Sequence, residues 1–196
     1  MSRTTIIVLI VAGATLAGFA VASNLERLEG TDSPTSPSVA AGPQKETLGW
    51  REVNGKPGEQ LVFTVDSIEV TDEGWSAVVG VENDTTVAWE LSPGVLPDGN
   101  FGLALFETGE IDELDRRNRE GTLPPVRAAT TYVPELATTL EPGGSWEGEI
   151  SAQGALVAGS FARVVFGTLI AVGSKPPEDY PKTFVWITDS TYELKP

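Results

Sequence analysis

The sequence predicts an all-β protein: one sandwich or barrel of about seven to nine strands behind a single apolar helix at the N-terminus. Two observations carry this prediction. From about Thr47 onward, short apolar runs alternate with turn residues at intervals of roughly ten residues, which is typical of antiparallel sheets. Ahead of them, residues 4–25 form one uncharged and largely apolar segment. The chain has 196 residues, which accommodates one ordinary domain and its appendages.

Residues 1–25 are predicted to be a transmembrane anchor or a signal peptide. As a helix, residues 4–25 would extend about 33 Å, enough to cross the apolar core of a bilayer. Arg3 precedes the segment and acidic residues follow it, which predicts an N-terminus in the cytoplasm and the remaining chain outside. The small residues around Ala22 also fit a signal-peptidase site, so cleavage after Ala22 with secretion of the rest is the alternative.

Residues 26–46 are predicted to be a flexible spacer, and residues 47–196 the folded domain. The stretch 30–44 is rich in Pro, Ser and Thr, and it has too few apolar residues to offset the entropy lost on ordering. A partly extended spacer of this kind would hold the domain away from the lipid surface.

Within the domain, apolar and polar residues alternate in short runs, which is the pattern of half-buried strands. Apolar residues occupy odd positions up to Val65 and even positions from Ile68. This change of phase predicts a β-bulge near Asp66–Ser67. The next strands are predicted at 75–81, 87–91 and 101–105.

Two segments depart from that pattern. Residues 111–120 are charged and carry acid-to-base pairs at spacing i,i+4, which predicts a short surface helix ending at Gly121. Tyr132 and Val133 are predicted to form an edge strand, because Pro134 cannot donate a hydrogen bond to a neighbouring strand.

The last third of the chain has the clearest strand pattern. Residues 146–152 alternate between apolar and polar, which predicts one buried and one exposed face. Residues 161–172 are apolar at nearly every position, with Arg163 as one exception, which predicts a central strand covered on both faces. The strands at 184–194 complete a set of about eight.

The stretch from Leu140 to Phe166 resembles the late strands of secreted immunoglobulin-like sandwiches from bacteria and archaea. It shows a Leu-x-Pro-Gly turn, an alternating strand, a second turn at Gly159, and Phe161 at the start of a long apolar strand. The earlier segment VENDTTVAWEL is similar to the second and third strands of such domains. The resemblance implies an immunoglobulin-like β-sandwich outside the cytoplasm and says little about activity. Phe161 stands where these domains often have a tyrosine, so the hydrogen bond of a tyrosine corner cannot form there.

The composition excludes most catalytic chemistry. The chain has no His and no Cys, and therefore no Ser-His-Asp triad, no cysteine nucleophile, no disulfide and no zinc site with nitrogen or sulfur ligands. Its net charge of −15 opposes nucleic acid as a partner. No cofactor is expected, and the chain is predicted not to be an enzyme. A hydrolase that uses carboxylates alone is a remote alternative.

Calcium needs only oxygen ligands, so the acidic clusters are the candidate metal ligands. They are Asp72 and Glu73 in one predicted turn, and Glu110, Asp112 and Asp115 around the predicted helix. No D-x-D-x-D-G loop occurs, and three arginines in the second cluster compete for its carboxylates. An acidic surface without a bound ion is therefore favoured over a calcium site.

Asn83-Asp84-Thr85 is the one N-x-[ST] triplet in the sequence. It falls at a predicted strand end, which makes Asn83 the candidate attachment site for a glycan. The alternative is that Asn83 and Asp84 simply form a turn.

Four of the five tryptophans fall at strand positions and are expected to pack in the core rather than to act as platforms for sugars. They are Trp75, Trp89, Trp146 and Trp186. Trp50 precedes the first clear strand and is expected to be exposed.

The excess of acidic residues is spread along the domain, as on proteins of saline environments, where salt screens mutual repulsion. A halophilic source and an ordinary acidic surface protein both fit this composition. For a halophilic source we expect the melting temperature to rise from low to molar KCl. A melting temperature that stays flat over this range would contradict that origin.

Together these observations predict a non-enzymatic domain anchored in a membrane and facing outward. Its role would be structural, or the binding of another envelope protein or a glycan. The alternative from a different class is a calcium- or small-ligand-binding sensor or carrier domain.

Overall fold

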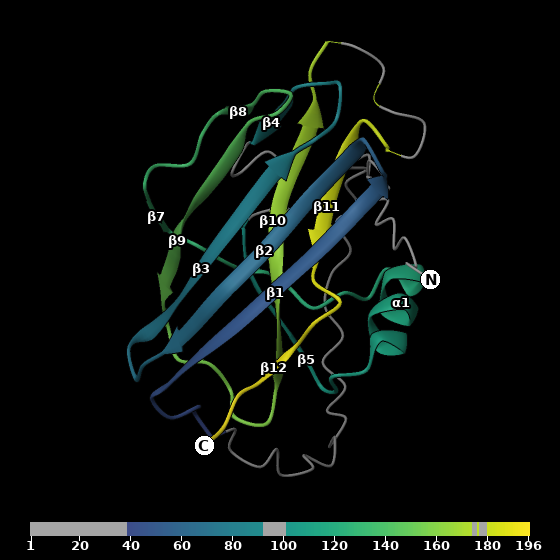
Figure 1. Cartoon of the computed structure of the whole chain (residues 1–196). Helices are drawn as coiled ribbons and strands as arrows, with labels where there is room; N and C mark the ends of the chain where they lie inside the picture. Colours follow the sequence, from purple (N-terminus) through teal and green to yellow (C-terminus); the bar gives the residue numbers. More distant parts are fainter. Residues whose placement is uncertain (1–38, 92–100, 174–175, 177–179) are drawn as a thin grey trace, which may run out of the picture.

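The computed structural model describes residues 39–91, 101–173, 176 and 180–196 of the chain. These residues form a mostly β structure, with two antiparallel sheets packed face to face and one short helix (Figure 1). The predicted N-terminal anchor lies outside the described residues. Among the helices of the described part, none is both long and apolar enough to cross a membrane.

The described residues contain twelve strands and one helix. In chain order they are β1 (Gln44–Lys56), β2 (Glu59–Val70), β3 (Gly74–Asn83), β4 (Trp89–Leu91), β5 (Gly102–Phe106), α1 (Ile111–Glu120), β6 (Arg127–Ala128), β7 (Thr131–Val133), β8 (Thr139–Leu140), β9 (Ser145–Gln153), β10 (Phe161–Ala171), β11 (Thr183–Ile187) and β12 (Tyr192–Glu193). The prediction of a mostly β chain is confirmed, with twelve strands in the described residues where about seven to nine were expected, and α1 coincides with the predicted surface helix.

The first sheet has the strand order β1-β2-β3-β9-β7. The predicted bulge lies in β2, because Val65 pairs with Val79 and Ser67 pairs with Val78, which leaves Asp66 unpaired in this ladder. The short strand β7 lies at the edge of the sheet, as its proline neighbour predicted.

Strand β1 is the main element that the sequence pattern did not predict. It begins at Gln44, within the segment predicted as spacer. Two of its residues toward the second sheet are polar, Glu52 and Asn54, so the strand lacks the apolar alternation of its neighbours. Trp50 lies in β1 and packs partly buried against the main core, which corrects the expectation that it is exposed.

Strand β10 is the centre of the second sheet. Val165 pairs with Gly102 of β5 on one edge and with Ile187 of β11 on the other. Leu169 pairs in the same way with β4 and β11. Strands β5 and β4 therefore follow one another along one edge of β10, and β12 and β11 along the other.

The main core between the sheets is rich in aromatic rings. Phe63 of β2 has its ring centroid 4.9 Å from Phe166 of β10 and stacks on Trp186 of β11 at 5.4 Å. Such contacts join the two sheets through large apolar surfaces. The four tryptophans expected in the core are all buried, which confirms that prediction: Trp75, Trp89, Trp146 and Trp186.

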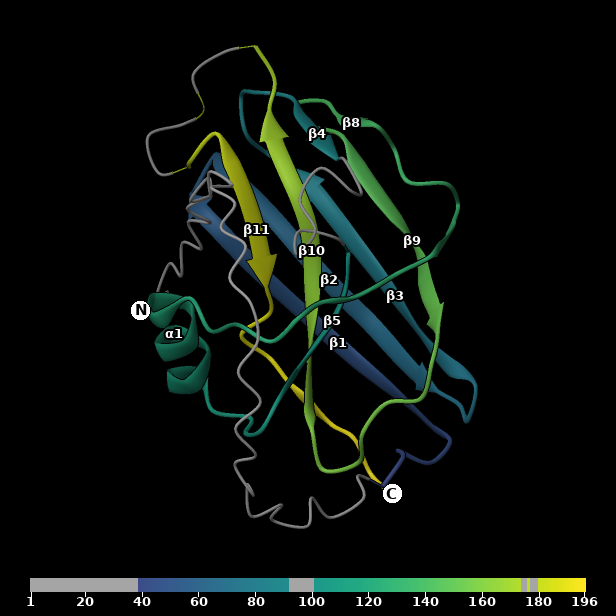
Figure 2. The ribbon, with the colours of Figure 1, turned by 180° about the vertical axis from the view of Figure 1, so that it is seen from behind.

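Helix α1 packs against the outer face of the second sheet and lies at the β11 side of the sandwich (Figure 2). Leu114 of the helix packs there with Phe106, Val165 and Ile187. This extra layer explains why β10 is apolar on both faces, and it confirms the prediction of a strand covered on both sides. The helix ends at Gly121, whose φ of 67° lies in the left-handed region that glycine adopts without strain.

Candidate functional site

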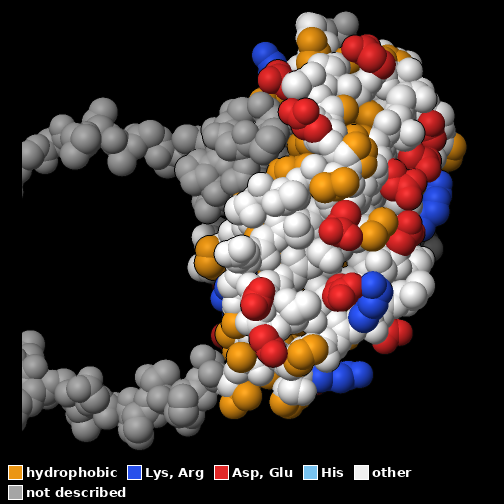
Figure 3. Space-filling model, turned by 90° about the vertical axis from the view of Figure 1, so that its left-hand side faces the viewer, with side chains coloured by type: hydrophobic (Ala, Val, Ile, Leu, Met, Phe, Trp, Pro, Cys, Tyr) orange, Lys and Arg blue, Asp and Glu red, His pale blue; other side chains and the backbone are white. Residues whose placement is uncertain are grey.

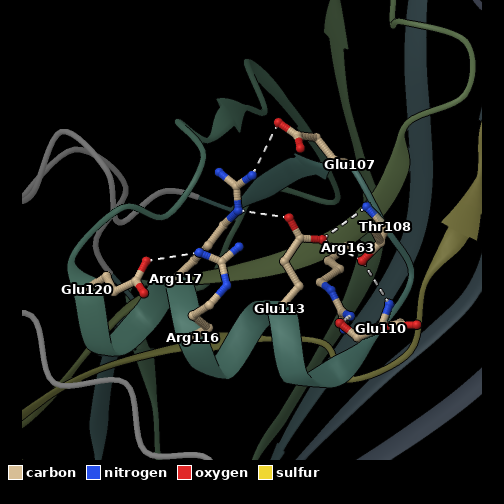
Figure 4. A network of polar contacts seen from close by, with 8 residues as sticks. All are labelled: Glu107, Thr108, Glu110, Glu113, Arg116, Arg117, Glu120 and Arg163. Atoms are coloured by element: carbon tan, nitrogen blue, oxygen red, sulfur yellow. Dashed lines mark hydrogen bonds and ion pairs between the residues drawn. The ribbon is translucent and has the colours of Figure 1, made fainter.

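Arg163 is a fully buried charge between β10, the start of α1 and the turn that follows β11 (Figure 4). Its guanidinium donates to the carbonyl oxygens of Thr188 at 2.8 Å and Asp189 at 2.5 Å. It also donates to the carbonyls of Gly109 at 3.2 Å and Glu110 at 3.0 Å. One side chain thus fixes two separate loops to the central strand.

The same turn is fixed from the other side by Glu52 of β1. Its carboxylate accepts hydrogen bonds from the indole Nε1 of Trp186 at 3.0 Å, the backbone N of Asp189 at 2.9 Å and the backbone N of Ser190 at 2.8 Å. Burial lowers the pKa of Arg163, and the carboxylates of Asp189 and Glu52 oppose this shift. The guanidinium keeps its proton, because arginine is not deprotonated in proteins.

The carboxyl group of Asp189 has a perturbed titration. Burial, and after it the neighbouring Glu52 carboxylate, raise the pKa of Asp189 to about 6, while Arg163 opposes the rise. Its Oδ1 atom is buried and has no hydrogen-bond partner among the described groups. The folded protein therefore holds a proton on Asp189 more tightly than an unfolded chain does.

This shift predicts that Asp189→Asn stabilises the protein at neutral pH. A raised carboxyl pKa contributes stability that is full below about pH 4 and is lost as the pH rises through about 6. Removing the charge should increase the free energy of unfolding at pH 7.5 by about 1 kcal/mol, after allowance for solvent around this half-buried group. The gain should shrink as the pH falls to 4.

The measurement is urea unfolding of both proteins at several pH values between 4 and 8. An exposed aspartate of β2 gives the matched control: Asp66→Asn should leave the pH profile of stability unchanged. A constant difference between Asp189→Asn and the native protein over the whole pH range would contradict the raised pKa.

Three acidic residues around α1 are paired with arginine, namely Glu107, Glu113 and Glu120. The buried carboxylate of Glu113 accepts hydrogen bonds from Thr108 through N at 3.0 Å and Oγ1 at 2.7 Å, and from Nε of Arg117 at 2.8 Å (Figure 4). Burial raises the pKa of Glu113, but these hydrogen bonds outweigh it and lower the pKa overall. Arg117 also lies 3.3 Å from the Glu107 carboxylate. Arginine thus competes for the carboxylates here, as the sequence indicated.

The five calcium candidates fall in two places. Asp72 and Glu73 lie in the turn between β2 and β3, while Glu110, Asp112 and Asp115 lie at and on α1. The turn and the helix lie on opposite sides of the sandwich in both ribbon views (Figures 1 and 2). Within the described residues no three carboxylates are placed to hold one metal ion. Calcium binding stays a prediction without a defined site.

Asn83 is completely buried at the corner between β3 and β4. Its Nδ2 donates to the carbonyls of Val87 and Leu140, both at 2.9 Å. Its Oδ1 accepts from the backbone N of Thr85 at 3.0 Å and from the Thr85 hydroxyl at 2.6 Å. That hydroxyl in turn accepts a hydrogen bond from the indole of Trp89 at 3.0 Å. The burial of this amide and its hydrogen bonds favour the turn, while glycosylation of Asn83 stays a prediction.

A groove of about 510 Å³ runs along the end of the first sheet, where β3, β9 and the edge strand β7 meet. Trp75 and Ala152 line it together with polar residues of β7, β9 and the adjoining turns. The polar members of the lining are Thr71, Glu73, Thr130, Thr131, Ser151 and Gln153. Figure 3 shows the molecule from the side of β7 and β9, where acidic side chains lie scattered among uncharged surface.

The sequence pattern missed Glu52, Asp189 and the groove, because each depends on strands that are distant in the chain. One feature pointed to the polar cluster: Arg163 interrupts an otherwise apolar strand. A buried guanidinium requires several acceptors. The pattern could not say that these acceptors come from residues 109–110 and 188–189.

Comparison with protein-family models, with curated proteins and with solved structures found no match to this chain. The function proposed below therefore depends on the geometry and chemistry of the chain itself.

Proposed function

We propose that this chain is a non-enzymatic immunoglobulin-like domain, held at the outer side of a membrane by its N-terminal apolar segment. There it has a structural or binding role at the cell envelope. The observation that carries the fold part of this proposal is the strand order. One sheet contains β2-β3-β9-β7, and the other places β10 between β11 and the β4–β5 edge.

Constant-type immunoglobulin domains place strands A-B-E-D in one sheet and C-F-G in the other. Taken in chain order, β2, β3, β4–β5, β7, β9, β10 and β11 correspond to A through G and fall in the same two sheets. Strand β1 extends the first sheet at its A edge, and α1 is inserted between the C and D positions. This correspondence supports an immunoglobulin-like sandwich with two additions.

The use of the buried charges supports a role other than catalysis. Within the described part of the chain, Glu113 and Arg163 are the charged residues that are buried. Glu113 accepts three hydrogen bonds, and the two terminal nitrogens of Arg163 donate four to loop carbonyls, while its Nε has no partner among the described groups. Groups used in this way stabilise a framework. The uncharged segment 4–25 supports attachment to a membrane, and the acidic surface supports partners other than nucleic acid.

The membrane topology is tested with an epitope tag fused after Pro196 of the full chain through a flexible linker, since Pro196 lies against Gly42. Intact cells are treated with a protease, and the tag is followed by immunoblot. We expect the tag to be digested from outside while a cytoplasmic marker protein stays intact. We also expect the full chain to sediment with membranes, and a chain lacking residues 1–25 to stay soluble inside the cell.

Mass spectrometry of the native protein distinguishes a retained anchor from cleavage after Ala22. Either mature form agrees with an outward-facing domain. A tag that is digested only after cell lysis would overturn the proposed location, whichever N-terminus is found.

A further inference from the structure

One side of the sandwich is linked through a turn rather than through a shared strand. Among the described residues, β1 pairs only with β2, and β11 and β12 pair only with β10, so both sheets have an edge strand on this side (Figure 1). The turn at residues 188–190 joins β11 to β12, and Glu52 of β1 binds its backbone. A movement of this turn therefore changes a contact between the two sheets.

The two halves of the turn are held by different groups. Thr188 is bound to β10 twice: its backbone N donates to the carbonyl of Val164 at 3.0 Å, and its hydroxyl accepts the N–H of Val164 at 3.0 Å. Asp189 and Ser190 instead donate their backbone N–H groups to the Glu52 carboxylate, at 2.9 and 2.8 Å. The second half can thus leave Glu52 while Thr188 stays on the sheet.

The carboxyl group of Asp189 is poorly accommodated in the closed turn. Its Oδ1 atom is buried and has no hydrogen-bond partner among the described groups. The guanidinium of Arg163 donates to the main-chain oxygen of Asp189 rather than to this carboxyl oxygen. The Glu52 carboxylate binds the backbone of the same residue, so a negative charge already lies close by. An ionised Asp189 is therefore disfavoured here by burial and by a like charge.

Charged groups face Asp189 from three elements, namely Glu52 from β1, Arg163 from β10 and Asp115 from α1. Burial and the two carboxylates favour the neutral acid, whereas the guanidinium favours the anion, and the balance raises the pKa of Asp189 from 3.8 to about 6. A side chain that moves into water regains the lower value. The closed turn is therefore favoured most below about pH 4, and this advantage is lost as the pH rises through about 6.

We propose that residues 189–190 form a pH-dependent latch between the two sheets, closed on Glu52 when Asp189 is neutral and released from Glu52 when Asp189 is ionised. Release carries the Asp189 carboxylate into water and breaks the two backbone hydrogen bonds to Glu52, while Thr188 stays on β10. This conformational device goes beyond the structural or binding role proposed above and does not depend on the location of the domain.

The test is amide hydrogen exchange of the full chain in detergent micelles, followed by NMR at pH 5 and pH 7.5. Protection factors, which correct for the intrinsic effect of pH on exchange, are compared between the Asp189 and Ser190 amides and the β3–β9 ladder, which reports global unfolding. We expect the two turn amides to be at least about tenfold less protected than the ladder, which identifies a local opening. Their protection should fall at least about threefold from pH 5 to pH 7.5.

A variant without the titrating group separates the latch from other effects of pH. Asp189→Asn keeps the shape of the side chain and removes its charge, so it should abolish the fall in protection of the Ser190 amide between the two pH values. Asp66→Asn alters an exposed aspartate of β2 and is the matched control, which should keep the fall.

Two results would overturn the latch. Turn amides as well protected as the β3–β9 ladder at pH 7.5 would show that the turn opens only when the whole domain unfolds. A fall in protection that persists in Asp189→Asn would show that a group other than Asp189 controls the opening. Neither result bears on the protease-accessibility assay, so failure of the latch is distinguishable from failure of the proposed location.

Discussion

Replacing Arg163 with alanine is expected to destabilise the protein by about 4 kcal/mol, a large share of the stability of an ordinary domain. The substitution removes the donors for four carbonyl oxygens and opens a cavity beside the Phe106 ring, whose centroid lies 5.2 Å from the guanidinium carbon. It also leaves the carboxylates of Asp189 and Glu52 without their nearest buried positive charge.

Denaturant unfolding followed by tryptophan fluorescence measures this loss. Arg163→Met keeps most of the side-chain volume, so the difference between the Met and Ala variants reports the cavity, and the remaining loss reports the unsatisfied carbonyls. Arg116→Ala is the control, because this exposed arginine forms a surface pair with Glu120 and should change stability by less than about 0.5 kcal/mol. An Arg163→Met variant as stable as the native protein would show that water replaces the guanidinium without cost.

Asn83→Ala is expected to cost about 3 kcal/mol, or roughly 10 °C in melting temperature for a chain of this size. The amide makes two donated and two accepted hydrogen bonds inside a buried corner, and alanine removes all four; the Thr85 hydroxyl can still donate to the Val87 carbonyl at 3.1 Å. The local loss of structure should be largest at the junction of β3 and β4, because the Thr85 hydroxyl also accepts a hydrogen bond from the indole of Trp89.

Asn83→Asp sharpens this test, since aspartate keeps the acceptor for Thr85 and loses the donors to Val87 and Leu140. It should be destabilised at neutral pH to a similar degree as Asn83→Ala, because it also buries a charge. The neighbouring exposed residue gives the control, and Asp84→Ala should remain within about 0.5 kcal/mol of the native protein. An Asn83→Ala variant as stable as the native protein would show that the Asn83 amide is not needed to hold the corner between β3 and β4.

The strands with clear alternation were predictable because burial of one face requires an apolar residue at every second position. The bulge at Asp66 follows from a change of phase, and the two covered faces of β10 follow from a run of apolar residues. Strand β1 lacks this alternation, because two of its inward residues, Glu52 and Asn54, are polar. The inward position of Glu52 is explained only by its hydrogen bonds to the turn after β11, which lies more than a hundred residues away in the chain.

The polar sites, too, were only partly predictable from the sequence, because contacts between distant segments determine their surroundings. The Asn83 triplet satisfies a glycosylation pattern, and residue spacing alone cannot tell an exposed acceptor from a buried corner. Hydrogen bonds to Leu140, far along the chain, decide between them. The groove is likewise assembled from β3, β7 and β9, which are distant in the chain.

By itself the sequence determined the all-β class, most strand positions, the surface helix, and the exclusion of histidine and cysteine chemistry, because periodicity and composition are local properties of a chain. The tertiary structure alone decided which polar groups are buried and which groups hydrogen-bond them. Those outcomes depend on contacts between distant segments, and the free energy of a polar group depends on whether such a partner arrives.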